Sequence, residues 1–190
     1  MHADNWANKA KQEGYRTRAV YKLEEILKKV SFPNDSKVLD LGSAPGGWSH
    51  YLKVNYSNFK IYAVDILPMD EIKEVEFFQT GIEDLDSINM FNDLINKFDL
   101  VISDIAPNLT GMKAVDQPAV MYLAELAVDF AQHHLNKKGV FIAKLFQGEG
   151  FDEFVRMTRT LFNSVSLKKP DASRAKSREV YLLAKGLKSN

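Results

Sequence analysis

The chain has 190 residues, of which 45% are apolar, and 25 Lys and Arg balance 25 Asp and Glu. This size suits one α/β domain with a single core. Because the chain contains no Cys, disulfides, thiolate metal sites and cysteine nucleophiles are excluded. No apolar run reaches the roughly 18 residues of a membrane span, and the first residues lack the layout of a secretory signal. We expect a cytoplasmic protein without membrane contact; an organellar location after presequence removal stays open.

Strand and helix patterns alternate along the chain without a repeat or a linker, so we expect a single domain over residues 1–190. Helices are predicted over residues 16–30, 47–55, 86–96, 118–135 and 152–162. Strands are predicted over residues 37–41, 60–64, 75–79, 100–103, 140–145, 164–167 and 180–184. The alternation predicts an α/β fold, a mostly parallel sheet of seven strands with helices on both faces and ligands at the carboxyl ends of the strands.

The first predicted strand runs into a glycine-rich turn that opens a helix. The segment from Val38 to Trp48 reads VLDLGSAPGGW. Glycines let the backbone approach a ligand closely, and the helix offers its N-terminal N–H groups to a carboxylate or phosphate. The pattern is neither a Walker loop nor a clean G-x-G-x-x-G fingerprint, which disfavours a nicotinamide-dependent reductase. It predicts a nucleotide-sized pocket.

Charged residues stand at the ends of other apolar strands. Asp65 follows the glycine turn by roughly 20 residues, as ribose recognition requires, although a loop aspartate that caps the next helix has the same signature. Asp104 follows the fourth strand, and Lys144 follows the apolar residues 140–143. A lysine at such a position needs a counter-ion, so we predict an Asp104–Lys144 pair with either a catalytic or a purely structural role.

The neutral total conceals a segregation of charge. Residues 1–30 carry seven Lys and Arg against four Asp and Glu, and residues 151–190 carry nine against four. Residues 31–100 compensate with five basic and twelve acidic residues. Basic ends indicate a polyanion-binding face if they meet in space, whereas solvated helix faces explain the same counts.

Several segments occur in the order typical of the FtsJ/RrmJ family of ribosomal RNA 2′-O-ribose methyltransferases. They are YKL at 21–23, DLG at 40–42, APGGWS at 44–49, LPMD at 67–70, SD at 103–104, APN at 106–108, FQGEG at 146–150 and SREVY at 177–181. The chain resembles this family from about residue 5 to residue 187.

The resemblance implies a Rossmann-like methyltransferase that modifies the 2′-hydroxyl of a ribose, that of a uridine, in large-subunit ribosomal RNA. The implied cofactor is S-adenosylmethionine, with S-adenosylhomocysteine as product. We expect a monomer whose partner is ribosomal RNA within the large subunit. We predict no metal, because the four histidines do not form a ligand spacing. Methylation of tRNA or of a messenger cap, and a non-catalytic RNA-binding role in ribosome assembly, are the alternatives.

The resemblance also assigns site residues. The catalytic set is Lys22, Asp104, Lys144 and Glu179. The cofactor-binding set is Gly42, Ser43, Ala44, Pro45, Gly46, Gly47, Trp48, Asp65, Ile66, Gly81, Ile82 and Asp104. The family usually has an aspartate for the adenine amino group where this chain has Gly81, so either the backbone near Ile82 and a neighbouring acid such as Glu83 replace that contact, or cofactor affinity is lower.

RNA contacts are expected from the two basic ends of the chain. The predicted RNA-binding residues are Lys9, Lys11, Arg16, Arg18, Arg174, Lys176, Arg178 and Tyr181. Tyr181 is included as a platform on which a splayed base stacks. Residues 170–174 are expected to form a flexible loop that grasps RNA.

Overall fold

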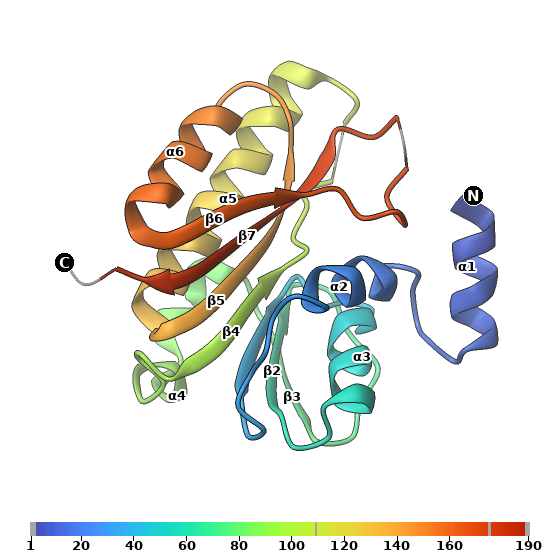
Figure 1. Cartoon of the computed structure of the whole chain (residues 1–190), viewed down its shortest axis with the longest axis vertical. Helices are drawn as coiled ribbons and strands as arrows, with labels where there is room; N and C mark the ends of the chain where they lie inside the picture. The colour runs from blue at the N-terminus through green and yellow to red at the C-terminus, as the bar shows by residue number, and fades with distance from the viewer. Residues whose placement is uncertain (1–2, 109, 175, 189–190) are drawn as a thin grey trace.

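One seven-stranded sheet runs through the molecule (Figure 1). The computed structural model describes residues 3–108, 110–174 and 176–188, so the ends of the predicted 1–190 domain lie outside the described residues. The strands are β1 (Lys37–Leu41), β2 (Lys60–Asp65), β3 (Val75–Gln79), β4 (Phe98–Ser103), β5 (Leu135–Phe146), β6 (Phe162–Lys168) and β7 (Glu179–Leu187). Their order is β3-β2-β1-β4-β5-β7-β6, and β7 alone of these strands runs antiparallel to its neighbours β5 and β6. The predicted mostly parallel α/β sheet is confirmed.

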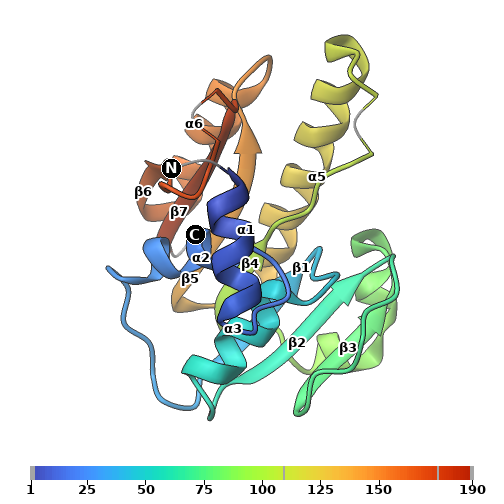
Figure 2. The same cartoon turned by 90° about the vertical axis from the view of Figure 1, so that its right-hand side faces the viewer.

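Helices cover both faces of the sheet (Figures 1 and 2). They are α1 (Ala3–Gln12), α2 (Val20–Leu27), α3 (Gly47–Asn55), the 3-10 helix η1 (Ile82–Ser87), α4 (Asn89–Asn92), α5 (Lys113–His134) and α6 (Phe151–Leu161). Side chains of α1, α2 and α3 pack into one hydrophobic cluster on the sheet, and those of α4, α5 and α6 pack into the other. Within the described residues, no helix combines the length and the apolar character that crossing a bilayer requires.

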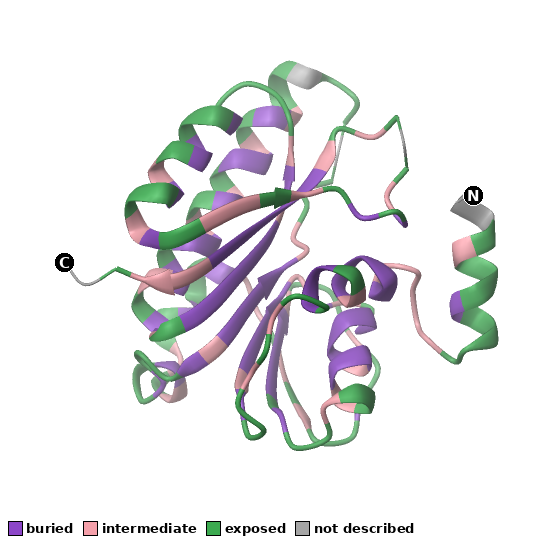
Figure 3. Cartoon of the chain, in the orientation of Figure 1, coloured by how far each residue is buried: buried purple, intermediate pink, exposed green. Residues whose placement is uncertain are grey.

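The central strands are buried on both faces, as Figure 3 shows. Successive side chains of a strand point to opposite faces, so Val38 joins the cluster under α2 and α3 while Leu39 joins the cluster under α5 and α6. Phe141 and Ile142 of β5 divide in the same way. This double burial explains why these strands are continuous apolar runs in the sequence.

Two helix predictions need correction, and one helix was not predicted. The helix predicted over residues 16–30 is shorter, and residues 16–19 instead form a strap that crosses the glycine loop. Residues 86–96 form only the end of η1 and the single turn α4. Helix α1 was not predicted, because it is polar and contacts the rest of the protein chiefly through Trp6 and Ala10. The sequence pattern of a helix is hard to recognise where only a few apolar residues mark its buried face.

The strand order creates a crevice at the carboxyl end of the sheet. The chain leaves β1 toward β2 on one side, and β4 later pairs with β1 on the other side. Ligands of open α/β sheets bind where the order reverses in this way. The glycine loop after β1 and the segment after β4 therefore flank the expected site.

Candidate active site

The glycine loop after β1 is held in one shape by the neighbouring strand ends. Backbone N–H groups of Gly42 and Ser43 donate to the carbonyl of Val64, at 2.8 and 3.1 Å. Gly42 has a positive φ of 75°, and an ideal Cβ there would lie 2.7 Å from Ile105 Cγ1 and 2.8 Å from its Cα. Because both the dihedral angle and the close approach disfavour a side chain, only glycine fits where the β1 and β4 loops meet.

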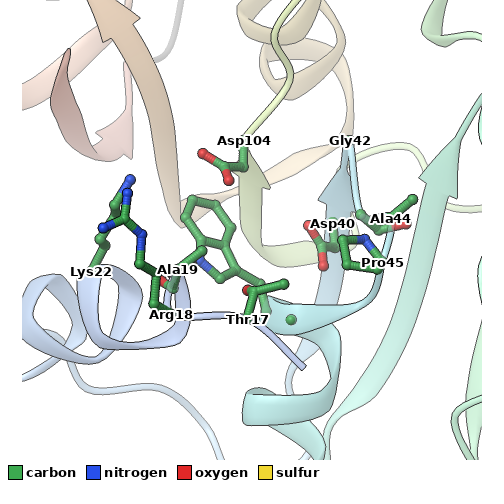
Figure 4. A pocket seen from close by; sticks show the side chains of 12 residues that line it. Thr17, Arg18, Ala19, Lys22, Asp40, Gly42, Ala44, Pro45 and Asp104 are labelled. Carbon is green, nitrogen blue, oxygen red and sulfur yellow. Dashed lines mark hydrogen bonds between the residues drawn. The ribbon is translucent and has the colours of Figure 1, made fainter. Parts of the chain in front are cut away.

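A cavity of about 230 Å³ lies beside this loop (Figure 4). It is lined by the strap residues Thr17, Arg18 and Ala19, by Lys22 of α2, by Asp40, Gly42, Ser43, Ala44, Pro45, Gly47 and Trp48, and by Asp104. Six of the predicted cofactor-binding residues of the glycine loop thus line one cavity with Asp104; Gly46 is buried nearby. The Trp48 indole N–H donates to the Ala19 carbonyl at 2.8 Å, which fixes the strap over the start of α3.

Asp40 is a buried acid in the cavity wall that the motif assignments missed. Its Oδ2 accepts a hydrogen bond from the Ser49 hydroxyl at 2.6 Å, whereas Oδ1 has no partner. Burial raises the pKa of Asp40 to about 7, and the nearby charge of Asp104 adds to this shift while the Ser49 hydrogen bond opposes it. A single acid among the apolar residues of β1 was the signal in the sequence.

The cavity fits a polar, cationic ligand. The side-chain oxygens Asp40 Oδ1, Ser43 Oγ and Thr17 Oγ1 are buried without a partner, and all three residues line it. Buried polar atoms normally carry hydrogen bonds, and a carboxylate oxygen in a buried wall favours a positive charge. A sulfonium that bears an amino acid group, as in S-adenosylmethionine, satisfies both requirements.

The remaining predicted cofactor residues lie at the ends of β2 and β3, outside the lining of the cavity. Asp65 bridges two loops, because Oδ2 accepts from the Ala44 N–H at 2.9 Å and Oδ1 accepts from the Leu67 N–H at 2.8 Å. Ile66 is exposed and Ile82 is nearly buried. At Gly81, an ideal Cβ would lie 2.9 Å from the Glu83 carboxylate, so that acid already occupies the space beside the glycine.

The four predicted catalytic residues come together as two ion pairs. Lys22 Nζ lies 2.7 Å from Glu179 Oε1, and Lys144 Nζ lies 3.0 Å from Asp104 Oδ1. The side chains of Lys22, Glu179 and Lys144 are only 10 to 13% exposed. Strand register produces this arrangement, because Ser103 pairs with Ala143 and therefore brings Asp104 beside Lys144.

Tyr181 joins the two pairs, which corrects its predicted role. It stands opposite Lys144 on the neighbouring strand, and its hydroxyl donates to Asp104 Oδ1 at 3.2 Å and accepts from Lys22 Nζ at 3.3 Å. Its ring is fully buried, so no base can stack on it. Burial and then the charges of Asp104 and Glu179 raise the pKa of Tyr181 well above its ordinary value. The hydroxyl therefore keeps its proton.

Glu179 stays ionised in this network. Burial by itself raises the pKa of the Glu179 carboxyl, but the hydrogen bond and charge of Lys22, with smaller contributions from Ser173 and Lys144, bring it below its ordinary value. A carboxylate that keeps its charge also keeps the Lys22 ammonium in place.

The basic ends of the chain both reach α2. Lys9 of α1 lies 4.5 Å from the ring centroid of Tyr21, and the Asp171 N–H of the β6–β7 loop donates to Glu25 at 2.8 Å. The predicted RNA-binding residues Lys9, Lys11, Arg174, Lys176 and Arg178 are exposed. Arg18 lines the cavity, as Lys22 does (Figure 4).

Arg16 has an additional role that the sequence did not indicate. Its guanidinium donates to the carbonyls of Pro45, Asp70 and Glu71 at 2.8 to 2.9 Å. These contacts tie the glycine loop to the segment after β2. RNA must therefore compete with these three carbonyls for the N–H donors of Arg16.

No group of three or more His, Asp and Glu side chains within the described ranges has the geometry of a metal site.

Solved structures place this fold in a known class. A human methyltransferase-like protein 13 in complex with S-adenosylhomocysteine aligns with a TM-score of 0.63 over 88% of this chain and 77% of its own, at 15% identity. A Plasmodium falciparum ribosomal RNA methyltransferase aligns with a TM-score of 0.82 over 93% of this chain and 100% of its own, at 28% identity. The sheet order and the glycine loop thus define a Rossmann-like methyltransferase.

Sequence comparison gives the family. The chain belongs to the FtsJ-like methyltransferase family, whose model matches residues 15–187. A ribosomal RNA large subunit methyltransferase E from Hahella chejuensis is 48% identical over 98% of this chain and 93% of its own length. The protein of the same description from Marinobacter nauticus is 48% identical over 97% of this chain and 91% of its own length.

The contribution of Asp40 to the unfolding free energy of the ligand-free protein is expected to fall as the pH rises from 4 to 8. Unfolding lowers the pKa of Asp40 from about 7 to its ordinary 3.8, so the unfolded chain holds fewer protons in this range. The shift corresponds to a loss on the order of 4 kcal/mol. Asp40→Asn removes this contribution, so urea unfolding at several pH values should give a flatter profile for the variant. Parallel profiles would contradict the assignment.

Arg16→Lys distinguishes support of the glycine loop from RNA binding. Lysine keeps the charge but lacks the fork of donors that reaches three carbonyls. Because the variant loses one or two hydrogen bonds from a charged donor to the glycine loop, we expect it to bind S-adenosylhomocysteine about tenfold more weakly in calorimetry. Lys11→Ala is the matched control, since that side chain is exposed on α1. Unchanged cofactor affinity in Arg16→Lys would contradict the role of Arg16 in supporting the glycine loop.

Proposed function

We propose that this protein transfers a methyl group from S-adenosylmethionine to the 2′-hydroxyl of a ribose, that of a uridine, in large-subunit ribosomal RNA. The observation that carries the proposal is the hydrogen-bonded series Glu179–Lys22–Tyr181–Asp104–Lys144, two members of which, Lys22 and Asp104, line the cavity. The names of the bacterial relatives, which are 48% identical, support the substrate class.

S-adenosylmethionine, when bound, supplies a methyl group activated by the sulfonium. Asp40 and Ser43 are proposed to hold its charged end in the cavity, and the glycine loop lets the backbone approach it. Asp65 and Ile82 are proposed to hold the adenosine, with Glu83 beside Gly81 as the nearby acid. Asp104 adds negative charge at the cavity wall, which favours a cationic ligand.

A ribose hydroxyl is a poor nucleophile, so the protein must orient it and stabilise the charge that develops on its oxygen. Lys144 is proposed to contact the 2′-oxygen. Asp104 accepts from its Nζ with both a carboxylate oxygen and the backbone carbonyl, so the lysine side chain has little freedom. Lys22, held by Glu179, supplies a second positive charge on the same face. The 2′-oxygen would take the methyl group as the bond between that group and the sulfonium sulfur breaks, S-adenosylhomocysteine would be the leaving group, and the 2′-hydroxyl proton would pass to Lys144 or to water. The pH–rate profile of kcat tests these two acceptors.

RNA is proposed to bind across α2, because both basic ends of the chain pack against this helix. Lys9 and Lys11 of α1 and Arg174 and Lys176 of the β6–β7 loop are exposed. These basic side chains would neutralise RNA phosphates without recognising a base sequence. The affinity for RNA should therefore depend strongly on the salt concentration. The protein is proposed to act as a monomer on RNA within the large subunit.

The first test is transfer of a labelled methyl group to undermodified large ribosomal subunits, with free ribosomal RNA, tRNA and capped RNA in parallel. We expect label in the subunit RNA at one alkali-resistant 2′-position, and a uridine at that position. Label in tRNA or in the cap alone would keep the chemistry and overturn the substrate. RNA binding without any label would favour the non-catalytic role in ribosome assembly.

Lys144→Met tests the assignment of the central residue. Methionine keeps the volume of the side chain without its charge, so methyl transfer should fall by about 10³-fold, a magnitude common for loss of one electrostatic or acid–base group. Affinity for S-adenosylhomocysteine should remain within a few-fold, because no predicted cofactor contact is removed. Lys138→Met is the matched control, since Lys138 lies on the same strand and is exposed. An active Lys144→Met enzyme would contradict the assignment.

A further inference from the structure

Glu179 accepts two side-chain hydrogen bonds on the same oxygen. Oε1 lies 2.7 Å from Lys22 Nζ and 2.8 Å from Ser173 Oγ. The Glu179 side chain is 13% exposed, so these two donors set its position more than water does. Ser173 is the only residue of the β6–β7 loop, within its described part, that a hydrogen bond joins to this carboxylate. No motif assigned a role to it.

The loop places Ser173 by contacts of its own. The Ser173 N–H donates to the Pro170 carbonyl at 2.9 Å, which closes a turn. The Asp171 N–H donates to Glu25 of α2, and Ala172 is only 3% exposed. This side of the loop is therefore anchored against α2, the helix that carries Lys22.

The residue after Ser173 faces the solvent. Arg174 is exposed and belongs to the predicted RNA-binding set. Two consecutive residues thus have different contacts. Arg174 is a proposed RNA contact, and the Ser173 hydroxyl donates to the proposed catalytic carboxylate of Glu179. The shared chain restricts how far Arg174 can move without moving Ser173.

We propose that Ser173 is a positioning residue for methyl transfer, whose hydroxyl fixes Glu179 and through it Lys22. This inference rests on the proposed function of the site. The hydroxyl donates to the carboxylate and so favours its charged form, which holds the Lys22 ammonium. Ser173 does not touch the reacting atoms, so it acts on kcat through the geometry of the ion pair.

Several charged groups surround Glu179, and the test must separate their effects from that of Ser173. Lys22 of α2 and Lys144 of β5 lower the pKa of the carboxyl, while Lys169 of the loop donates to the Glu179 backbone carbonyl at 2.9 Å. Tyr181, on the same strand as Glu179, and Asp104, which follows β4, complete the network. These groups stay in place when only the Ser173 hydroxyl is removed.

Ser173→Ala is the test variant. We expect kcat to fall about tenfold, as for loss of a hydrogen bond to a charged group, with KM for RNA and affinity for S-adenosylhomocysteine within about twofold. The acidic limb of the kcat profile should move to higher pH, because the carboxylate loses a donor that favours ionisation. Carboxyl-carbon NMR should show the same upward shift in the pKa of Glu179. Ser173→Thr keeps a hydroxyl and should restore both the rate and the titration.

Ser177→Ala is the matched control. Ser177 lies in the same loop, but its hydroxyl accepts from the Glu179 backbone N–H at 3.1 Å and leaves the carboxylate alone. Its pH profile should stay that of the wild type. An unshifted acidic limb in Ser173→Ala, or an equal shift in Ser177→Ala, would overturn the proposal. The NMR titration needs no methyl transfer, so it tests the Ser173 contact even if the proposed substrate is wrong.

Discussion

The structure depends on the close association of two partly buried ion pairs around one tyrosine hydroxyl. Lys22 and Glu179 are 157 residues apart in the sequence and 2.7 Å apart in the fold. Breaking such a pair by removing one partner leaves a charge with little solvent, at a cost of about 3 to 5 kcal/mol. The α2 helix and strands β4, β5 and β7 must therefore all be in place before any of these charges is tolerated.

Strand register sets the face of the sheet on which these charges meet. Lys144, Tyr181 and Glu179 point to the face that α2 covers, because antiparallel pairing sets Lys144 opposite Tyr181 and Glu179 lies two residues before it. A slip of one residue would turn these side chains toward α5. The long apolar stretch of β5 and β7 fixes the register and, with it, the geometry of the charges.

Stability and ligand binding oppose each other at Asp40. An ionised carboxyl with an unpartnered oxygen is unfavourable in the ligand-free protein, and the pKa near 7 reflects that cost. The same oxygen is the natural partner for a cationic ligand in the cavity. A cationic ligand that pairs with this oxygen removes that cost, so its binding raises the unfolding free energy of the protein.

The seven strands, the glycine loop and the residues that end each strand are predictable from the amino-acid sequence, because apolar runs and turn residues are local patterns. The four charged residues of the site are also predictable from it. The sequence does not predict that Tyr181 lies inside the network, that Arg16 holds three carbonyls or that Ser173 reaches Glu179. These contacts depend on strand register and on how α2 packs against the sheet, and no local pattern encodes either.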